Sequence, residues 1–108
     1  MAPLKSVETL LLTMLAAGDR HGYGLRQDIL DHTGGEVELE PGNLYRHLRR
    51  LEEAGAVAET RRPPGEDDRR IYYRLTPAGR RLMSAELRRL QSLVRLAEAR
   101  RLISRGSV

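Results

Sequence analysis

Polar and basic side chains recur at helical spacing between residues 41 and 55 of this 108-residue chain. Asparagine amides match the major-groove edge of adenine and arginine forks match that of guanine, while other arginines and tyrosine hydroxyls bind phosphate oxygens. Residues of these types, spaced mostly three or four apart, have the chemistry required to recognise double-stranded DNA. The candidates for DNA binding in this segment are Asn43, Tyr45, Arg46, His47, Arg49 and Arg50.

Three leucines predict how this segment presents those side chains. Leu44, Leu48 and Leu51 are four and three positions apart, so they share one face of a helix. Pro41 suits the first turn of such a helix and Gly55 closes it. A solvated amphipathic helix would look equally polar, but the basic character of the exposed face favours DNA recognition. The side chains expected on the face opposite the leucines are Asn43, Arg46, His47 and Arg50.

Two shorter helices are predicted to precede this one. At residues 6–17 apolar side chains recur at helical spacing, with Ser6 as the expected N-cap and Gly18 as the stop. A tight turn leads to a second helix at about residues 23–32, which would bury Leu25, Ile29 and Leu30. With the third helix they give a helix-turn-helix pattern.

After the third helix the periodicity changes from helical to alternating. Residues 56–62 and 70–75 predict two strands around a polar turn, which form a β-hairpin. Strict alternation directs Ile71, Tyr73 and Leu75 toward the core. The opposite face either clamps the DNA backbone or is simply solvated. The hairpin candidates for DNA binding are Arg61, Arg62, Arg69, Arg70, Tyr72 and Arg74.

A last helix is predicted to begin after Thr76, a cap residue that is followed by Pro77 at the first helical position. Its apolar side chains form a heptad seam too long for a small domain to cover completely. The seam favours a homodimer, although Leu93 and Leu96 widen it enough for packing on the chain's own first helix, and a dimer can do both. The predicted dimerisation residues are Met83, Leu87, Leu90, Val94 and Ala97.

The length of the chain fits one compact unit with a single core. We expect a DNA-binding part at residues 1–76 and a C-terminal dimerisation helix at residues 77–108. The predicted fold class is therefore mainly α with a small β-hairpin wing, a winged helix-turn-helix followed by a dimerisation helix.

The net charge of +4 is unevenly distributed. Residues 1–40 hold three basic and seven acidic side chains, a net −4, whereas residues 41–108 hold 16 basic and eight acidic ones, a net +8. Eighteen of the 19 basic residues are arginine, whose rigid fork suits phosphate oxygens and guanine edges. This distribution fits a phosphate-rich partner, but genomic base composition can also favour arginine, so the motifs must decide.

Little in the sequence supports an enzyme or a membrane protein. The chain has no cysteine, so no disulfide, thiolate nucleophile or cysteine metal site is expected. His21 is expected in a turn and His32 at a helix end, while His47 senses pH, contacts DNA or is exposed without either role. The longest apolar stretch, residues 10–17, is far shorter than the ~20 residues that cross a bilayer. We predict a cytoplasmic protein with no cofactor, no metal and no catalytic residue.

Three groups of residues, taken together, carry a resemblance to a known family. They are His21-Gly22-Tyr23, then Leu44-Tyr45 with Leu48, Leu51, Glu52 and Gly55, and finally Tyr73-Arg74-Leu75-Thr76 with Gly79. Their order and spacing resemble the motifs of the PadR family of bacterial transcription regulators, in its short form with a single C-terminal helix. The resemblance spans about residues 6–103 and implies a dimeric winged helix, a recognition helix at about residues 42–54 and dimerisation through the last helix. It also implies repression relieved by a small molecule.

The predicted function is that of a sequence-specific transcription regulator, a dimeric repressor released by a small-molecule effector. Such a dimer would place two recognition helices in successive major grooves, with half-sites about 10 bp apart or a multiple of that. The alternative is a winged helix that serves as a protein-interaction module without specific DNA binding. The arginines predicted at the exposed face argue against that alternative.

Overall fold

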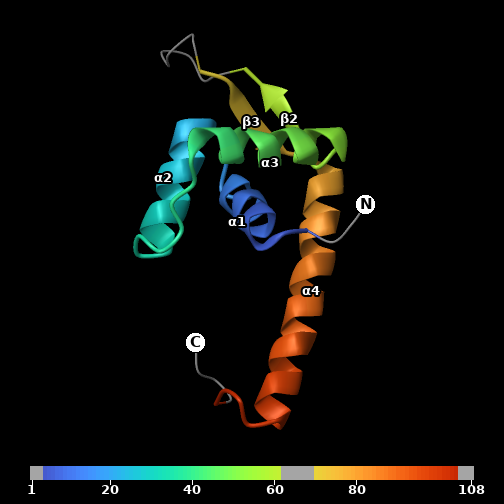
Figure 1. The fold of residues 1–108 in the computed structure, drawn as a ribbon. Coiled ribbons are helices and arrows are strands. Elements are labelled where there is room, and N and C mark those ends of the chain that lie inside the picture. The colour runs from blue at the N-terminus through green and yellow to red at the C-terminus, as the bar shows by residue number, and fades with distance from the viewer. Residues whose placement is uncertain (1–3, 62–69, 105–108) are drawn as a thin grey trace.

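The structure of the protein, a computed structural model, describes residues 4–61 and 70–104. It is mainly helical with a small antiparallel sheet, which confirms the predicted fold class. Figure 1 shows the elements, which in chain order are α1 (Ser6–Leu15), β1 (Arg20–His21), α2 (Gly22–His32), α3 (Pro41–Glu53), β2 (Val57–Thr60), β3 (Tyr72–Leu75) and α4 (Pro77–Ala99).

Helix α1 lies at the centre of the core, in contact with α2, α3, α4 and β3. Its Leu11 and Leu12 are completely buried. The leucines Leu44, Leu48 and Leu51 of α3 are buried as their spacing predicted, because one face of that helix packs on the core. Figure 1 shows α3 crossing over α1 with the hairpin on its other side, so α3 is held from both directions.

The ends of the first two helices differ slightly from the predictions. The N-cap of α1 is Lys5 rather than Ser6, because the Glu8 carboxylate accepts a hydrogen bond from the Lys5 backbone N–H at 2.9 Å. The helix ends at Leu15, two residues before the predicted end. Helix α2 begins at Gly22, where the His21 ring caps it by accepting a hydrogen bond from the backbone N–H three residues on, at 2.9 Å.

The hairpin of β2 and β3 was predicted, but the third strand was not. The sheet order is β1-β3-β2, all antiparallel, with His21 opposite Tyr72 and Val57 opposite Leu75. Pairing with β1 changes the inward set of the hairpin. Tyr72, expected outside, is 5% exposed because the His21 ring packs edge-on against it, whereas Ile71, expected in the core, precedes β3 and is 51% exposed.

Helix α4 begins as its cap residues predicted. The Thr76 hydroxyl accepts from the Gly79 N–H at 3.0 Å and donates to the Gly55 carbonyl at 2.5 Å, which ties the start of α4 to the end of α3. A Cβ at Gly79 would lie 2.0 Å from the Ala56 carbonyl oxygen, so only glycine fits there. From this joint α4 extends away from the other helices, and its far half stands clear of them in Figure 1.

Candidate nucleic-acid interface

Helix α3 exposes part of the side-chain set that was predicted to read DNA. Asn43, Tyr45, Arg46 and Arg49 are all exposed. The Arg46 guanidinium donates to the Asn43 side-chain oxygen at 2.6 Å, so these two groups are already linked near the start of the helix. The exposed part of α3 therefore presents amide, phenol and guanidinium groups together.

The other two predicted readers on α3 are only partly exposed and approach α1 instead. His47 Nδ1 lies 3.0 Å from a carboxylate oxygen of Glu8, and Arg50 Nε lies 3.2 Å from the same oxygen. Glu8 is completely buried on α1. The prediction that His47 and Arg50 lie opposite the leucines is wrong, because a buried carboxylate requires charged or hydrogen-bonding partners and draws both side chains to the α1 flank.

Sequence reasoning missed Glu8, although a signal was present. Its position places it on the same helical face as Leu11, Leu12 and Leu15, which are buried. A carboxylate on a core face is rarely buried without a partner. Its partners lie about 40 residues away on α3, and only the tertiary fold identifies them.

The wing contributes fewer DNA-binding candidates than predicted. Arg61, Arg70 and Arg74 are exposed at or beside the strands. Tyr72 is buried against His21, so it cannot reach a DNA backbone from this position. Arg62 and Arg69 lie outside the described residues.

Tyr73 on β3 is the core-facing tyrosine that the alternation predicted. It is 4% exposed, and burial raises its pKa to about 12, with the nearby Glu52, Tyr45 and Glu59 raising it further. The phenol is therefore neutral at any pH at which DNA binding would be measured. Tyr73 anchors the wing to the body and takes no part in an exposed site.

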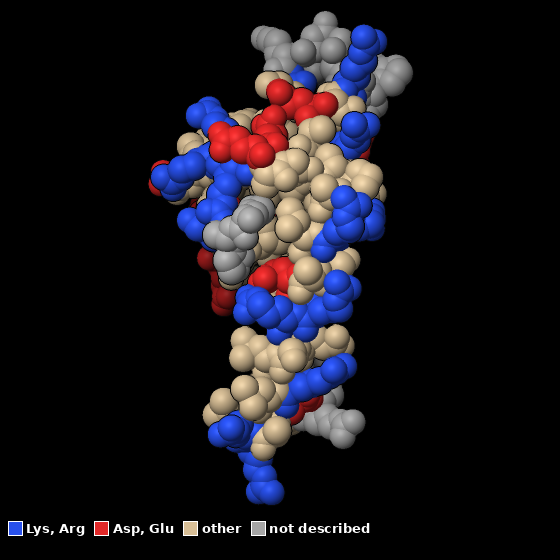
Figure 2. Space-filling view, turned by 90° about the vertical axis from the view of Figure 1, so that its right-hand side faces the viewer, with Lys and Arg blue, Asp and Glu red and all other residues tan. Residues whose placement is uncertain are grey.

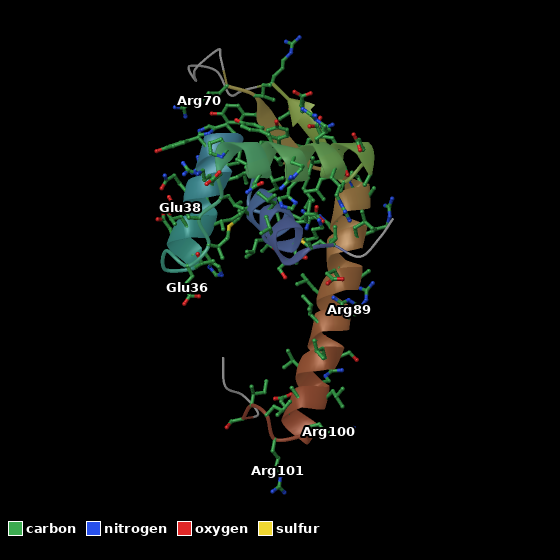
Figure 3. The ribbon with its side chains drawn as sticks, in the orientation of Figure 1. Glu36, Glu38, Arg70, Arg89, Arg100 and Arg101 are labelled. Atoms are coloured by element: carbon green, nitrogen blue, oxygen red, sulfur yellow. The ribbon has the colours of Figure 1, made fainter. Side chains whose placement is uncertain are left out.

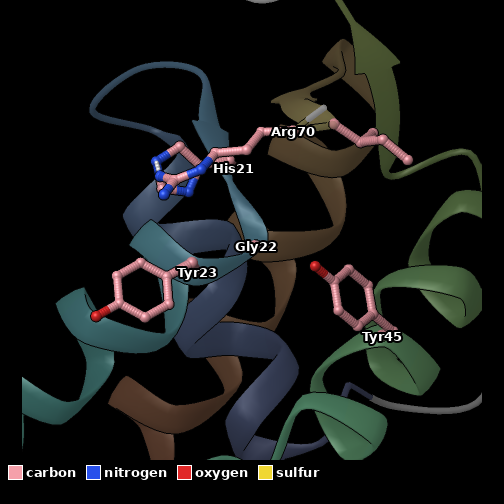
Figure 4. Close-up of a pocket in the computed structure, with 6 residues that line it drawn as sticks. His21, Gly22, Tyr23, Tyr45 and Arg70 are labelled. Carbon is pink, nitrogen blue, oxygen red and sulfur yellow. Dashed lines mark hydrogen bonds between the residues drawn. The ribbon is translucent and has the colours of Figure 1, made fainter. Parts of the chain in front are cut away.

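A pocket of about 200 Å³ opens where α2, α3 and the wing meet (Figure 4). The side chain of Tyr45 closes one side, and Arg70 extends over the other from the wing. The His-Gly-Tyr motif and Ile71 form the rest of the wall. The lining residues are His21, Gly22, Tyr23, Tyr45, Arg70 and Ile71.

Basic side chains lie at both ends of the fold, whereas two acidic ones lie along its side. Figure 3 places Arg70 at the wing end, while Glu36 and Glu38 lie along the side of the molecule near the α2–α3 connection. Arg100 and Arg101 lie at the far end of α4. The acidic surplus of residues 1–40 is thus partly carried by a connection that lies away from the wing, so it does not oppose an anionic partner there.

The predicted seam on α4 divides into two parts. Met83 is 7% exposed and belongs to the chain's own core, where its sulfur lies 3.7 Å from the Thr13 hydroxyl of α1. Leu87 and Val94 are 44% and 46% exposed. Figure 2 shows uncharged surface alternating with arginine side chains along the part of the molecule below the body, which is α4.

Neither a metal site nor a membrane span is found in the part of the chain that the structure describes. Residues 4–61 and 70–104 contain no group of three or more histidine, cysteine or acidic side chains that could hold a metal ion. No helix among these residues is long and apolar enough to cross a membrane.

The comparisons with known proteins decide the family. Residues 11–85 match the family model described as "Transcriptional regulator PadR-like family". The chain belongs to the PadR-like family. It is 34% identical over 90 residues to the transcriptional regulator Rv3488 of Mycobacterium tuberculosis, which covers 83% of this chain and 80% of that protein.

Solved structures of transcriptional regulators share the fold. A transcriptional regulator from Clostridium thermocellum superposes with a TM-score of 0.75 at 26% identity, covering 86% of this chain and 90% of that one. PadR of Bacillus subtilis in complex with operator DNA gives a TM-score of 0.66 at 19% identity, covering 77% of this chain and 47% of that one. This chain is therefore a PadR-like transcriptional regulator with a winged-helix fold.

Proposed function

We propose that this PadR-like chain is a homodimeric repressor that binds operator DNA through α3 and the wing. The observation that carries the proposal is the exposed set on α3, where Asn43, Tyr45, Arg46 and Arg49 share the solvent face of a helix whose leucines are fixed in the core. A helix presented in this way has the geometry of a major-groove reader. The B. subtilis PadR, whose fold this chain shares, is bound to operator DNA, which supports DNA as the partner.

Dimerisation is proposed through the outer half of α4. Leu87, Leu93, Val94 and Leu96 are 44% to 54% exposed, which is unusual for four large apolar side chains on one short helix segment. A second copy of the helix would cover them, together with Leu90 and Ala97. The two recognition helices would then be related by a two-fold axis, as a palindromic operator requires.

Release by a small molecule is the third part of the proposal. Helix α4 packs on α1, and α1 holds α3 through Glu8, so a ligand between α4 and α1 would act on the recognition helices by changing their separation. The described part of α4 has no aromatic side chain, so its contribution to such a ligand site is aliphatic. The measurement is the operator affinity with and without candidate metabolites. This part of the proposal fails if none both binds the protein and changes that affinity.

The first experiment measures binding of the full chain to the DNA upstream of its own coding region. Fluorescence anisotropy across a salt series, with a random duplex as control, separates specific from general binding. Tight, salt-sensitive binding well above the control is expected. Weak binding that is equal on both duplexes, and remains so for sequences obtained by random selection, would favour the protein-interaction module instead.

Arginine variants test which side chains read bases. Arg49→Ala is expected to weaken operator binding by roughly 1 to 3 kcal/mol and much less on random DNA, if Arg49 contacts a base. Arg88→Ala, an exposed arginine on α4, is the matched control and should change neither affinity. Equal losses for Arg49→Ala on operator and random DNA would instead assign Arg49 to the phosphate backbone.

A further inference from the structure

The pocket at the junction of α2, α3 and the wing is built around a close approach of Tyr45 to the protein backbone. A Cβ at Gly22 would lie 2.8 Å from the Tyr45 hydroxyl oxygen, so glycine at this position is what lets the phenol reach the start of α2. Figure 4 shows the hydroxyl pointing toward Gly22 across the pocket. Tyr45 is also 46% exposed, so a molecule outside the protein can reach it.

Arg70 is held at the opposite side of the pocket by the Tyr23 ring of the His-Gly-Tyr motif. Its guanidinium carbon lies 5.7 Å from the centre of that ring, a cation–π distance. Its Nη1 also lies 3.0 Å from His21 Nε2, but His21 Nδ1 already accepts from the Gly24 N–H, so Nε2 carries a proton and this contact is not a hydrogen bond. The His21 and Tyr23 rings are themselves stacked, with centroids 6.3 Å apart. A side chain already fixed in this way loses little conformational freedom when it binds an anion.

The chemistry of the pocket suits a phosphate group. Arg70 supplies a positive charge, and the Tyr45 hydroxyl supplies a hydrogen-bond donor. The first turn of α2, an 11-residue helix, begins at Gly22 between them, and the dipole of a helix favours an anion at that end. None of the six residues that line this pocket carries a carboxylate. The volume of about 200 Å³ leaves room for a sugar attached to the phosphate.

We infer that this pocket receives one backbone phosphate of the bound DNA, with the adjoining sugar beside Tyr45. Arg70 and Tyr45 contact the phosphate, while Tyr23 is the positioning residue that fixes the Arg70 guanidinium. The inference rests on the proposed function, since it assigns a backbone contact to the same DNA-binding face. It gives the His-Gly-Tyr motif a role outside base reading, which is to set the register of α3 along the groove.

The first test compares Arg70→Gln with Arg88→Gln, a matched change of an exposed arginine on α4. Arg70→Gln is expected to weaken binding at least about fivefold on operator and random duplex alike, and to lower the slope of log affinity against log salt by about 1 per bound protomer. Arg88→Gln should alter neither quantity. An unchanged salt slope for Arg70→Gln, or a loss confined to the operator, would overturn the inference.

The tyrosine variants separate contact from positioning. Tyr45→Phe removes only the hydroxyl and is expected to weaken binding on both duplexes by about threefold to tenfold. Tyr23→Phe keeps the ring under Arg70 and should bind like the unmodified chain, while Tyr23→Leu should resemble Arg70→Gln. Equal losses for Tyr23→Phe and Tyr23→Leu would show that the Tyr23 hydroxyl, not the ring, is what matters, and the positioning role would be wrong.

Methylphosphonate linkages locate the phosphate itself. One charged linkage at a time is replaced in each half-site, and the loss of affinity is measured for the unmodified chain and for Arg70→Gln. At one position the loss caused by the linkage and the loss caused by Arg70→Gln should not add. Additive losses at every position would overturn the inference even though the protein binds DNA. The proposed function fails in a different way, when the unmodified chain shows no specific binding at all.

Inorganic phosphate tests the other source of the same chemistry. If it shifted the amide resonances of Gly22 and Tyr45 while Arg70→Gln left DNA affinity intact, the pocket would be a site for a free phosphorylated molecule, and the inference would be wrong. If phosphate instead competes weakly with DNA, and the competition is lost in Arg70→Gln, the backbone assignment is supported.

Discussion

Helix α1 and the outer half of α4 carry large apolar side chains at nearly the same spacing, yet their surroundings differ. In α1, Leu11 and Leu12 are completely buried. In α4, Leu93 and Leu96 are 54% and 51% exposed. Both segments are regular helices, so the backbone does not distinguish them.

The difference shows that apolar spacing predicts a helix but not what covers it. A covered leucine has already contributed its hydrophobic free energy, about 25 cal/mol per Å² of apolar surface, to the folding of one chain. An exposed leucine has not made this contribution, so burying it against another surface would stabilise an association. The body of this protein thus stabilises the monomer, while outer α4 is available to stabilise an assembly.

The largest expected effect tests the covered side of this comparison. Leu12→Ala should lower the free energy of unfolding by about 2 to 5 kcal/mol, because it leaves a cavity at the centre of the core. Leu93→Ala is the matched change on outer α4. The free energy of unfolding that Leu93→Ala removes should be well under about 1 kcal/mol in dilute protein. It should grow with protein concentration if the proposed dimer forms. Urea unfolding at several protein concentrations measures both, and equal, concentration-independent losses would remove the distinction.

The next prediction concerns the exposed side. Val94→Glu should weaken self-association at least about a hundredfold, because a carboxylate would be buried against the partner helix without a counter-ion. Ser92→Glu introduces the same charge on an exposed position away from the apolar seam and is the control. Sedimentation velocity gives the dimer fraction for each. A dimer that survives Val94→Glu would place the interface elsewhere.

A smaller effect is expected from the one charged group on the covered face of α1. Glu8→Gln keeps an oxygen that can accept from the Lys5 N–H but removes the charge opposite His47 and Arg50. We expect a loss of roughly 1 to 3 kcal/mol in the free energy of unfolding. Glu53→Gln, on the exposed end of α3, should change stability by less than about 0.5 kcal/mol. If Glu8→Gln leaves the free energy of unfolding unchanged, the buried charge makes no net contribution to stability.

The smallest effect is absent at neutral pH and develops in alkali. The pKa of Tyr73 is about 12 in the folded chain, above its ordinary value of 10.0, so the folded state holds that proton more tightly than the unfolded state does. The resulting stability is fully present below pH 10 and is lost as the pH rises through about 12. In urea unfolding, the free energy of unfolding of Tyr73→Phe should fall less steeply over this pH window than that of the unmodified chain. Identical declines would indicate that other groups cause the loss of stability.

Features that depend on neighbouring residues were predicted well from the sequence. The leucines of α3, the Thr76 cap and Pro77 are local signals, because helical period and cap geometry involve only the next few residues. The position of His32 at the end of α2 has the same origin.

Features that depend on distant residues were missed. Strand β1 has only two residues and exists because β3 pairs with it, so no local periodicity indicates it. That pairing buried Tyr72 and left Ile71 outside. His47 and Arg50 turned toward Glu8 for the same kind of reason. The pocket combines a recognised motif with side chains from α3 and the wing, and only the fold brings them together.

Because α4 is long and is fixed at Thr76 and Gly79, a small rotation at this joint displaces its far end by a large distance. Its 23 residues at 1.5 Å rise each give an arm of about 34 Å, so a rotation of about 5° at the joint would move its far end by roughly 3 Å. The Thr76 hydroxyl donates to the Gly55 carbonyl just after α3, and Gly79 lies directly against the Ala56 carbonyl. These two contacts leave α4 little room to rotate relative to α3. In the proposed dimer, the small range of angles at this joint would limit how far the spacing of the two recognition helices can change.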